Sequence, residues 1–347
     1  MKKIITILVI AIFSISCSKD DEISKPIVPI SVTTDVYVAG FESNSSGIPV
    51  AKYWKNGNPV SITDGTYLAR INAIVVKGSD VHACGYEKNA SNQTIAKYWK
   101  NGIVTPLTNG SNFATINAMV VDGNDVHMTG IERNNLNQNI IQYWKNNLSY
   151  VITTGTYDAN ANAIAVSNSD VYIAGFEKNA AGKSVAKYWK NGTAVALSNG
   201  VYDEEATSIA VVGNDVYVTA IGTNASGILV AKYWKNGVVV NLTDGSNFAG
   251  ASAIVVKGSD VYVGGRESNG SNYIAKYWKN GTAVSVSDGS KNTYVTSIAV
   301  VGSDVYLSGI ETDATAISIS KFWKNGVLTN LTNNTTSQVY SIFVTSN

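Results

Sequence analysis

The sequence predicts an all-β protein, a seven-bladed β-propeller of four-stranded blades, and three observations predict it. The seven Trp residues of the 347-residue chain all stand in one recurring phrase of the type AKYWKNG, at spacings of 45, 45, 45, 45, 44 and 45 residues. Two further phrases, of the types SDVYVAGFE and NAIVV, recur with the same period. A self-similar period of roughly 40–50 residues is typical of propeller blades.

Each repeat contains four short apolar runs, which we expect to form strands a to d of one blade. At the start of the chain, strand b is residues 35–42 (DVYVAGFE), strand c is residues 50–55 (VAKYWK) and strand d is residues 59–63 (PVSIT). Strand a of the following repeat is residues 73–76 (AIVV). These runs are rich in Val, Ile, Thr and Tyr and are bounded by Gly and Asn, which favours strands over helices.

The connections within a repeat predict tight hairpins. Asn-Gly stands between strands c and d in six of the seven repeats, as in Asn56-Gly57, and Asn146-Asn147 takes its place in the third repeat. Because a type I′ turn needs positive φ at both central residues, Asn-Gly between two apolar runs is a strong hairpin signal. The pair Asn146-Asn147 should adopt the same turn with some extra strain.

The recurring Trp is best explained by packing between blades. Tyr53 and Trp54 are adjacent, so their side chains point to opposite faces of one strand. Both faces must then be buried, as they are when a sheet lies between two neighbouring sheets. A ring of aromatics that stack on sugars is the alternative for the seven residues Trp54, Trp99, Trp144, Trp189, Trp234, Trp278 and Trp323.

The two ends of the repeat region predict how the ring closes. Residues 29–34 (PISVTT) match strand a poorly, whereas residues 341–344 (SIFV) near the C-terminus match it well. We therefore expect the C-terminal strand to join the N-terminal blade, which closes the ring and leaves no open sheet edge between the two ends.

The repeats resemble those of bacterial β-propeller repeat families, which include lipoproteins and whose copies run much like residues 161–179 (ANAIAVSNSDVYIAGFEKN). The resemblance covers residues 31–347. It implies a seven-bladed, secreted or surface-exposed propeller, and it implies little about activity, because those families are mostly of unknown role.

The N-terminal residues predict export. Lys2 and Lys3 precede an apolar run, residues 4–13, that is too short to span a bilayer. Residues 14–17 (SISC) resemble a relaxed lipobox, the site at which signal peptidase II cuts before a Cys. We expect residues 1–16 to be a lipoprotein signal peptide.

Lipidation would then fall on Cys17, with residues 17–30 as a flexible acidic tether before the propeller of residues 31–347. Residues 18–22 (SKDDE) resemble the acidic signal that carries some Gram-negative lipoproteins to the outer face of the outer membrane. We expect a cell-surface protein whose contact with a membrane is made only by acyl chains, which anchor stably when there are several. An ordinary secretory signal with an incidental Cys17 is the alternative.

Composition and motifs exclude several function classes. The chain has 26 Lys and Arg against 25 Asp and Glu, so there is no electrostatic case for nucleic acid. His82 and His127 stand where other repeats carry Tyr, which indicates core positions rather than metal ligands. No nucleophile motif or phosphate-binding Gly loop occurs. We expect no catalytic residue, no metal, no cofactor and a monomeric propeller.

Recurring carboxylates and ammonium groups predict ion pairs between strands b and c. A Glu ends strand b in six repeats, of the type Glu42, and a Lys recurs on strand c in six repeats, of the type Lys52. Neighbouring strands would bring these side chains together with modest stabilisation. A ring of cation-binding carboxylates is the alternative.

A ligand site is predicted where the repeats differ. The a–b and c–d turns are short and uniform and share one face, whereas the b–c and d–a connections vary and share the other. Each d–a connection carries one aromatic residue: Tyr67, Phe113, Tyr157, Tyr202, Phe248 and Tyr294. Hydrogen-bonding residues follow at the start of strand a, at the predicted mouth of the central channel: Asn72, Asn117, Asn162, Thr207, Ser252, Thr296 and Tyr340. This composition suits a neutral polar ligand, and gap filling between blades is the alternative.

These features favour a lipid-anchored, surface-exposed binding module for a glycan or a protein partner, acting through the d–a and b–c loops. A hydrolase or lyase is the first alternative and would need carboxylates near the channel mouth. The candidates for such a role are Asp158, Asp203, Glu204 and Glu205. A structural or adhesion subunit of an envelope complex is the second alternative.

Overall fold

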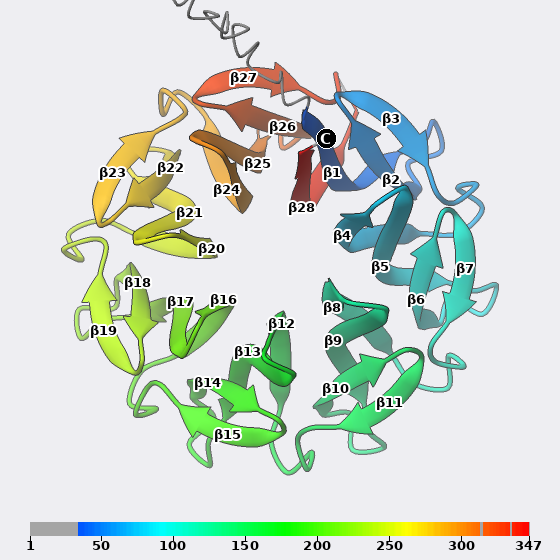
Figure 1. The fold of residues 1–347 in the computed structure, drawn as a ribbon, viewed down its shortest axis with the longest axis horizontal. Coiled ribbons are helices and arrows are strands. Elements are labelled where there is room, and N and C mark those ends of the chain that lie inside the picture. The colour runs from blue at the N-terminus through cyan, green and yellow to red at the C-terminus, as the bar shows by residue number, and fades with distance from the viewer. Residues whose placement is uncertain (1–33, 313–314, 334, 347) are drawn as a thin grey trace, which may run out of the picture. The chain divides into compact units, whose positions relative to one another are not determined.

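The computed structural model describes residues 34–312, 315–333 and 335–346. These residues form 28 strands in seven four-stranded antiparallel sheets, and the sheets stand as blades around a central axis (Figure 1). The predicted seven-bladed propeller is therefore confirmed. The predicted signal peptide, Cys17 and the tether lie outside the described residues.

Each blade repeats the same order of four strands from the axis outward. The inner strands (a) are β28 (Ser337–Ser346), β4 (Ala69–Lys77), β8 (Ala114–Asp122), β12 (Ala159–Ser167), β16 (Glu204–Val212), β20 (Ala249–Lys257) and β24 (Asn292–Val301). The second strands (b) are β1 (Thr34–Ser43), β5 (Asp80–Lys88), β9 (Asp125–Arg133), β13 (Asp170–Lys178), β17 (Asp215–Thr223), β21 (Asp260–Ser268) and β25 (Asp304–Thr312).

Strands c and d complete the blades. The third strands are β2 (Pro49–Lys55), β6 (Thr94–Lys100), β10 (Asn139–Lys145), β14 (Ser184–Lys190), β18 (Leu229–Lys235), β22 (Tyr273–Lys279) and β26 (Ser318–Lys324). The outer strands are β3 (Asn58–Ser61), β7 (Ile103–Pro106), β11 (Leu148–Val151), β15 (Thr193–Ala196), β19 (Val238–Asn241), β23 (Thr282–Ser285) and β27 (Val327–Asn330). Blade 1 contains β28 and β1–β3, blade 2 contains β4–β7, and the numbering continues to blade 7 with β24–β27.

The ring closes as the sequence predicts. Strand β28 pairs antiparallel with β1, from Thr34 opposite Ser346 to Glu42 opposite Ser337, and Figure 1 shows the two ends of the described chain side by side in one blade. The inner strands contact one another around the axis in the order β28, β4, β8, β12, β16, β20 and β24, and β24 contacts β28 again. No blade is left without a neighbour.

The seven Trp residues join adjacent blades. Their exposed fractions are 0–4%. Trp99 of blade 2 packs in one cluster with Tyr37 of blade 1. Tyr53 packs against that same cluster, whereas its neighbour Trp54 packs with Tyr306 of blade 7. The two adjacent aromatics therefore serve opposite interfaces, and burial of the Trp rings excludes the sugar-stacking alternative.

The uniform turns are held by hydrogen bonds and an ion pair between the KNG and DV phrases, which explains why both phrases recur. In blade 1, Asn56 Oδ1 accepts a hydrogen bond from the Val36 amide at 2.8 Å, and Asn56 Nδ2 donates to Asp35 Oδ1 at 2.7 Å. Lys55 Nζ lies 2.9 Å from Asp35 Oδ2. The hydrogen bond from Asn56, and after it the Lys55 ammonium, hold the pKa of Asp35 below its usual range. The c–d turn is thereby fixed to the start of strand b.

Replacing Asn147 by Gly is expected to stabilise the protein by about 0.5–1 kcal/mol. Asn147 has a φ of 72°, in the left-handed region, at the position where the other blades carry Gly. The reciprocal change Gly102→Asn in blade 2 should destabilise by a similar amount, because φ there is 80° and an added side chain meets no neighbour. Urea denaturation checks both, and equal midpoints for the two variants would contradict the expectation.

The two His residues occupy core positions. His82 Nδ1 lies 2.6 Å from Tyr98 Oη, and His127 Nδ1 lies 2.7 Å from Tyr143 Oη. Burial lowers the pKa of both imidazoles. Within the described ranges, no group of three or more His, Cys, Asp or Glu side chains could hold a metal ion.

Candidate functional site

The seven hydrogen-bonding residues predicted at the channel mouth share one backbone position. Each is the extra residue of a β-bulge between strands a and b, where the register shifts: Asn72, Asn117, Asn162, Thr207, Ser252, Thr296 and Tyr340. A bulge re-aims the side chain of its extra residue. These side chains therefore leave the alternation of the strand.

Five of these side chains join neighbouring blades. Asn72 Nδ2 donates to the carbonyl of Ile116 on the next inner strand at 2.8 Å, and Thr207 Oγ1 donates to the carbonyl of Ala251 at 2.8 Å. The same bond to the same position of the next blade is made by Asn117, Asn162 and Ser252. The donors that were expected to meet a ligand thus already have partners, and their structural role is to connect inner strands around the axis.

The other two bulge residues contact polar side chains. Thr296 Oγ1 lies 3.1 Å from Ser308 Oγ. Tyr340 Oη donates to Gln338 Oε1 at 2.7 Å and accepts from Arg70 at 3.1 Å. The Arg70 guanidinium also lies over the rings of Tyr340, Phe41 and Tyr86 at 5.2–5.5 Å. Between blades 1 and 2 the channel mouth is therefore filled by protein groups.

The six loop aromatics do not form one ring. Tyr67, Tyr157 and Tyr202 occupy equivalent loop positions and are 39–41% exposed. Phe113 and Phe248 stand one position later, directly before an inner strand, and the Arg133 guanidinium covers Phe113 at 4.9 Å. Tyr294 lies inside β24 rather than in a connection, opposite Ile310, because it stands two residues before the bulge, a position that lies within the inner strand in every blade. The aromatics are thus distributed over three depths.

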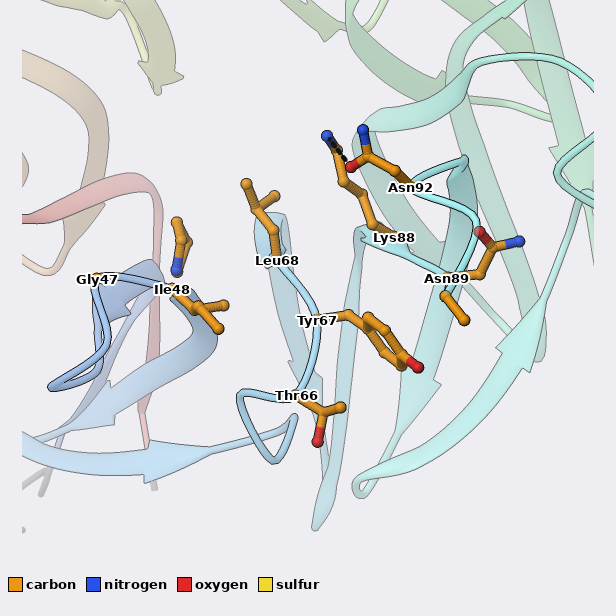
Figure 2. A pocket seen from close by; sticks show the side chains of 10 residues that line it. Gly47, Ile48, Thr66, Tyr67, Leu68, Lys88, Asn89 and Asn92 are labelled. Atoms are coloured by element: carbon orange, nitrogen blue, oxygen red, sulfur yellow. Dashed lines mark hydrogen bonds between the residues drawn. The ribbon is translucent and has the colours of Figure 1, made fainter.

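One of these aromatics lines a cavity of about 360 Å³. Figure 2 shows Tyr67 and Leu68 between Ile48 on one side and Lys88 and Asn89 on the other. The cavity lies between the b–c loops of blades 1 and 2, and Lys88 Nζ donates to Asn92 Oδ1 at its edge, at 2.8 Å. An exposed Tyr ring beside amide groups could hold a small neutral polar group.

The b–c loops themselves are more regular than their sequences predict. In blade 1, Asn44 Oδ1 accepts from the amides of Ser46 and Ile48 at 3.0 Å, and its Nδ2 donates to the Gly65 carbonyl of the d–a connection at 3.3 Å. Asn89, Asn134, Asn179, Asn224 and Asn269 accept equivalent bonds in their own loops. Blades 1 to 5 therefore carry different side chains on a common loop backbone, whereas the loop of blade 6 closes one residue earlier, with the Asn272 amide donating to Asn269 Oδ1.

The strongest difference between blades lies two residues before each bulge, on the inner strand. Seven blades place seven different residues there: Arg70, Thr115, Asn160, Glu205, Gly250, Tyr294 and Gln338. Sequence reasoning missed this position apart from Tyr294 and Glu205, although an alignment of the seven copies shows it. These residues lie at the loop-side ends of the inner strands, so they surround the entrance to the channel.

Three of the four candidate carboxylates have structural partners. Asp158 Oδ1 accepts from the Asn139 amide at 2.8 Å, and Asp203 Oδ1 accepts from the Ser184 amide at 2.9 Å. Glu204 pairs with Lys232 at 3.0 Å in blade 5, where strand b ends in Gly222 instead of Glu. These three groups hold loops and strands together.

The remaining predicted carboxylates form the expected ion pairs. Glu42 pairs with Lys52 at 2.7 Å, and equivalent pairs join Glu87 to Lys97, Glu177 to Lys187, Glu267 to Lys276 and Glu311 to Lys321. In blade 3, Gln142 Nε2 lies 3.5 Å from Glu132 Oε2. An ammonium thus neutralises five of these carboxylates, which argues against a ring of cation-binding Glu side chains.

Glu205, on the inner strand β16, is the exception among the four candidate carboxylates. It forms no salt bridge with any other described residue, and its one hydrogen bond comes from Ser184 Oγ at 3.4 Å. Burial raises the pKa of the Glu205 carboxyl above its usual value of 4.5, and the nearby Asp203 adds to the rise. A desolvated carboxyl without a cationic partner does not stabilise the fold, which makes Glu205 a candidate for a functional residue.

Glu205 lines a cavity of about 380 Å³ between blades 5 and 6, together with Thr207, Ser252, Gly250 and Arg266. Arg266 stands at a strand-b position that is apolar in the other blades: Phe41, Tyr86, Ile131, Phe176, Ile221 and Ile310. Gly250 is its partner in the register, and the Ile221 side chain of blade 5 occupies the place that a side chain at Gly250 would take. The cavity therefore combines a cation at a position that is apolar in the other blades, a carboxyl without a salt bridge to any described residue, and the apolar side chain of Ile221.

Replacing Glu205 by Gln is expected to raise Tm by about 1–2 °C at pH 7. Because its folded-state pKa is raised, ionisation of Glu205 costs stability as pH rises from the usual value through the raised one, and the full cost remains at neutral pH. Below about pH 3 the Glu205 carboxyl is protonated in both the folded and the unfolded state, so the two proteins should melt alike. A variant that melts lower than the wild type at pH 7 would show that Glu205 supports the fold.

Comparisons with solved structures place the chain among proteins that share the β-propeller fold. The chain is similar to a Mycobacterium tuberculosis puromycin-hydrolyzing peptidase (TM-score 0.59, 10% identity, 86% of this chain and 53% of that one). It is also similar to the β-propeller domain of the Trilobed protease from Pyrococcus furiosus, which has an open velcro topology (TM-score 0.53, 8% identity, 86% of this chain and 94% of that one).

A third similar structure is the Pyrococcus horikoshii acylaminoacyl peptidase (TM-score 0.54, 11% identity, 86% of this chain and 51% of that one). The chain therefore spans about half the length of the two whole peptidases that it matches. At these identities the likeness shows the fold alone. No protein-family model and no curated protein matches the chain.

Strands make up the regular structure of the described residues. Apart from positions 313–314 and 334, residues 34–346 contain no helix with the length and apolar character needed to cross a bilayer.

Proposed function

We propose that this propeller is a binding module that takes a glycan or a protein partner on the face formed by its b–c and d–a connections. The observation that carries the proposal is the single inner-strand position where seven blades differ completely, from Arg70 to Gln338, on a scaffold that otherwise repeats the same contacts. Side chains that differ at one depth around one axis can recognise an asymmetric ligand, whereas repeated pairs stabilise the scaffold.

The carboxylates support binding over catalysis. A hydrolase or lyase needs an acid and a base near the reacting bond, and among the four loop candidates only Glu205 lacks a structural partner. Hydrolase remains the second candidate, because Glu205 combines a raised pKa with a cavity and propellers of similar fold occur in two peptidases.

We further propose that the module is anchored to the outer membrane through lipid on Cys17 and exposed on the cell surface. The proposal rests on the lipobox-like residues 14–17 and the acidic residues 18–22. Labelling of cells with radioactive palmitate, followed by proteolysis of intact cells, tests it. A Cys17→Ser variant should lose the label and leave the membrane fraction, and a variant that keeps both would contradict lipidation.

A glycan array and a pull-down of envelope proteins, both with the full-length protein in detergent, test the proposed function. Capture of one glycan class or one partner supports the binding module. The Glu205→Gln variant separates binding from catalysis when turnover is measured at a ligand concentration that saturates the variant. A hydrolase or lyase would lose all turnover of an array ligand in that variant. An empty array together with stable envelope partners would favour the structural subunit instead.

A further inference from the structure

The cavity between blades 5 and 6 presents two opposite charges that do not neutralise each other. Glu205 and Arg266 both line it, and neither forms a salt bridge with any residue that the structure describes. The neighbouring Glu204, by contrast, is paired with Lys232 at 3.0 Å. Unpaired charges in a partly desolvated cavity raise the free energy of the unliganded protein. A ligand of complementary charge offsets this cost when it binds.

The Arg266 guanidinium is held in place before any ligand arrives. Its central carbon lies 5.0 Å from the ring centroid of Tyr273 and 5.0 Å from that of Tyr294. The two rings restrict the plane of the guanidinium by cation–π contact, and its Nε is buried without a hydrogen-bond partner. A planar fork of donors with a fixed orientation matches a carboxylate, which can accept two parallel hydrogen bonds.

The comparison with Arg70 shows what distinguishes Arg266. Arg70, at the entrance between blades 1 and 2, donates to Tyr340 Oη at 3.1 Å and is covered by three aromatic rings. Arg266 makes no hydrogen bond to another described residue, and it lines the cavity between blades 5 and 6. One Arg therefore closes its interface and the other faces an open cavity.

The neutral lining supplies acceptors. The Thr207 hydroxyl donates to the Ala251 carbonyl at 2.8 Å, and the Ser252 hydroxyl donates to the Val295 carbonyl at 2.5 Å. A hydroxyl that has used its proton keeps lone pairs as acceptors. The walls between the two charges therefore favour a ligand with N–H donors.

We propose that this cavity binds a short peptide-like zwitterion, with an ammonium group on Glu205 and a carboxylate on Arg266. The inference rests on the proposed function, in that it assigns a ligand class to one sector of the same entrance. A neutral sugar would offer hydroxyl hydrogen bonds but no charge opposite to either group, and an ion of one sign would neutralise only one of them. Peptides carry both charges on a chain whose backbone N–H groups can donate to the hydroxyls.

Calorimetric titration of the full-length protein with di-, tri-, tetra- and pentaglycine tests the proposal. One length should bind best, because only one spans the two charges, and N-acetylation or C-amidation of that peptide should weaken it about 10-fold or more. Glu205→Gln and Arg266→Ile use residues that other blades carry at the same positions, Gln338 and Ile310, so the fold should tolerate both.

Each variant should lose sensitivity to one end of the peptide. Glu205→Gln should bind free and N-acetylated peptide equally weakly, and Arg266→Ile should do so for free and amidated peptide. Lys88→Gln, in the cavity of blades 1 and 2, is the matched control and should bind as the wild type does. Capped peptides that bind as tightly as free ones, or no binding of any length at millimolar concentration, would overturn the proposal.

The pH dependence gives a second readout. Ser184, Asp203 and Lys178 act on the Glu205 carboxyl, and burial raises its pKa most; Arg266 lines the same cavity. Only the ionised carboxylate attracts an ammonium, so affinity should fall as pH is lowered through that raised pKa, and Glu205→Gln should remove the fall. If glycans bind the entrance while no peptide does, this inference fails and the proposed function stands. If peptides bind while the array and the pull-down are empty, this inference stands and the proposed glycan or protein ligand is wrong.

Discussion

Trp144→Ala should destabilise the propeller by about 3–5 kcal/mol, which is the largest effect that we expect from a single substitution. Trp144 is 1% exposed and packs with Ile116, Met119 and Met128 of its own blade and with Tyr98 of blade 2. Removing the indole leaves a cavity that two separate sheets would have to move to fill. The free energy of unfolding from urea denaturation measures the loss.

The matched control for Trp144→Ala is Leu148→Ala in the same blade. Leu148 lies on the outer strand and is 65% exposed, so its replacement should change stability by less than about 0.5 kcal/mol. Trp144→Phe should fall between the two, because a smaller ring still fills part of the interface. Equal losses for Trp144→Ala and Leu148→Ala would contradict the assignment of the seven Trp residues to blade interfaces.

Deleting residues 337–347 should abolish cooperative unfolding of the propeller. The deletion removes β28, which is the inner strand of blade 1 and the only strand that pairs with the inner side of β1. It also removes the contacts that β28 makes with β4 and β24, so blades 2 and 7 lose their neighbour at the axis. An exposed edge on β1 would then favour aggregation.

A synthetic peptide of residues 337–347, added to the shortened protein, is the control for this deletion. Because β28 binds as a strand along β1, the peptide should restore a single melting transition in proportion to its concentration. Differential scanning calorimetry follows both proteins. A shortened protein that melts like the full chain without the peptide would show that the ring does not depend on this closure.

Most of the fold could be predicted from the sequence, because its determinants recur in every repeat. The period of Trp54 and its equivalents predicts the number of blades, and the adjacent Tyr53 and Trp54 predict burial on both faces. The match of residues 341–344 to strand a predicts ring closure. Because the same pattern occurs in seven copies, a strand that is ambiguous in one copy can be assigned from the others.

The functional side of the molecule was harder to predict, because it depends on what each side chain meets in space. The sequence does not show the bulge that turns Asn72 toward the next blade. The Asn72 amide was therefore predicted to meet a ligand, whereas it donates to a backbone carbonyl. Glu204 and Glu205 are neighbours in the chain, yet one pairs with Lys232 and the other has no cation. Arg266 interrupts an apolar position and could have been found by aligning the seven copies.

The central claim is that ligands bind at the loop-side entrance of the channel and not at the opposite face or the outer strands. Three proteins tested on one array of glycans and peptides examine it most directly: the wild type, a Glu205→Gln/Arg266→Ile variant, and a Leu148→Thr/Val238→Thr variant of exposed outer-strand residues. We predict that the entrance variant loses the wild-type ligands while the outer-strand variant keeps them. Loss of those ligands from the outer-strand variant alone would contradict the account.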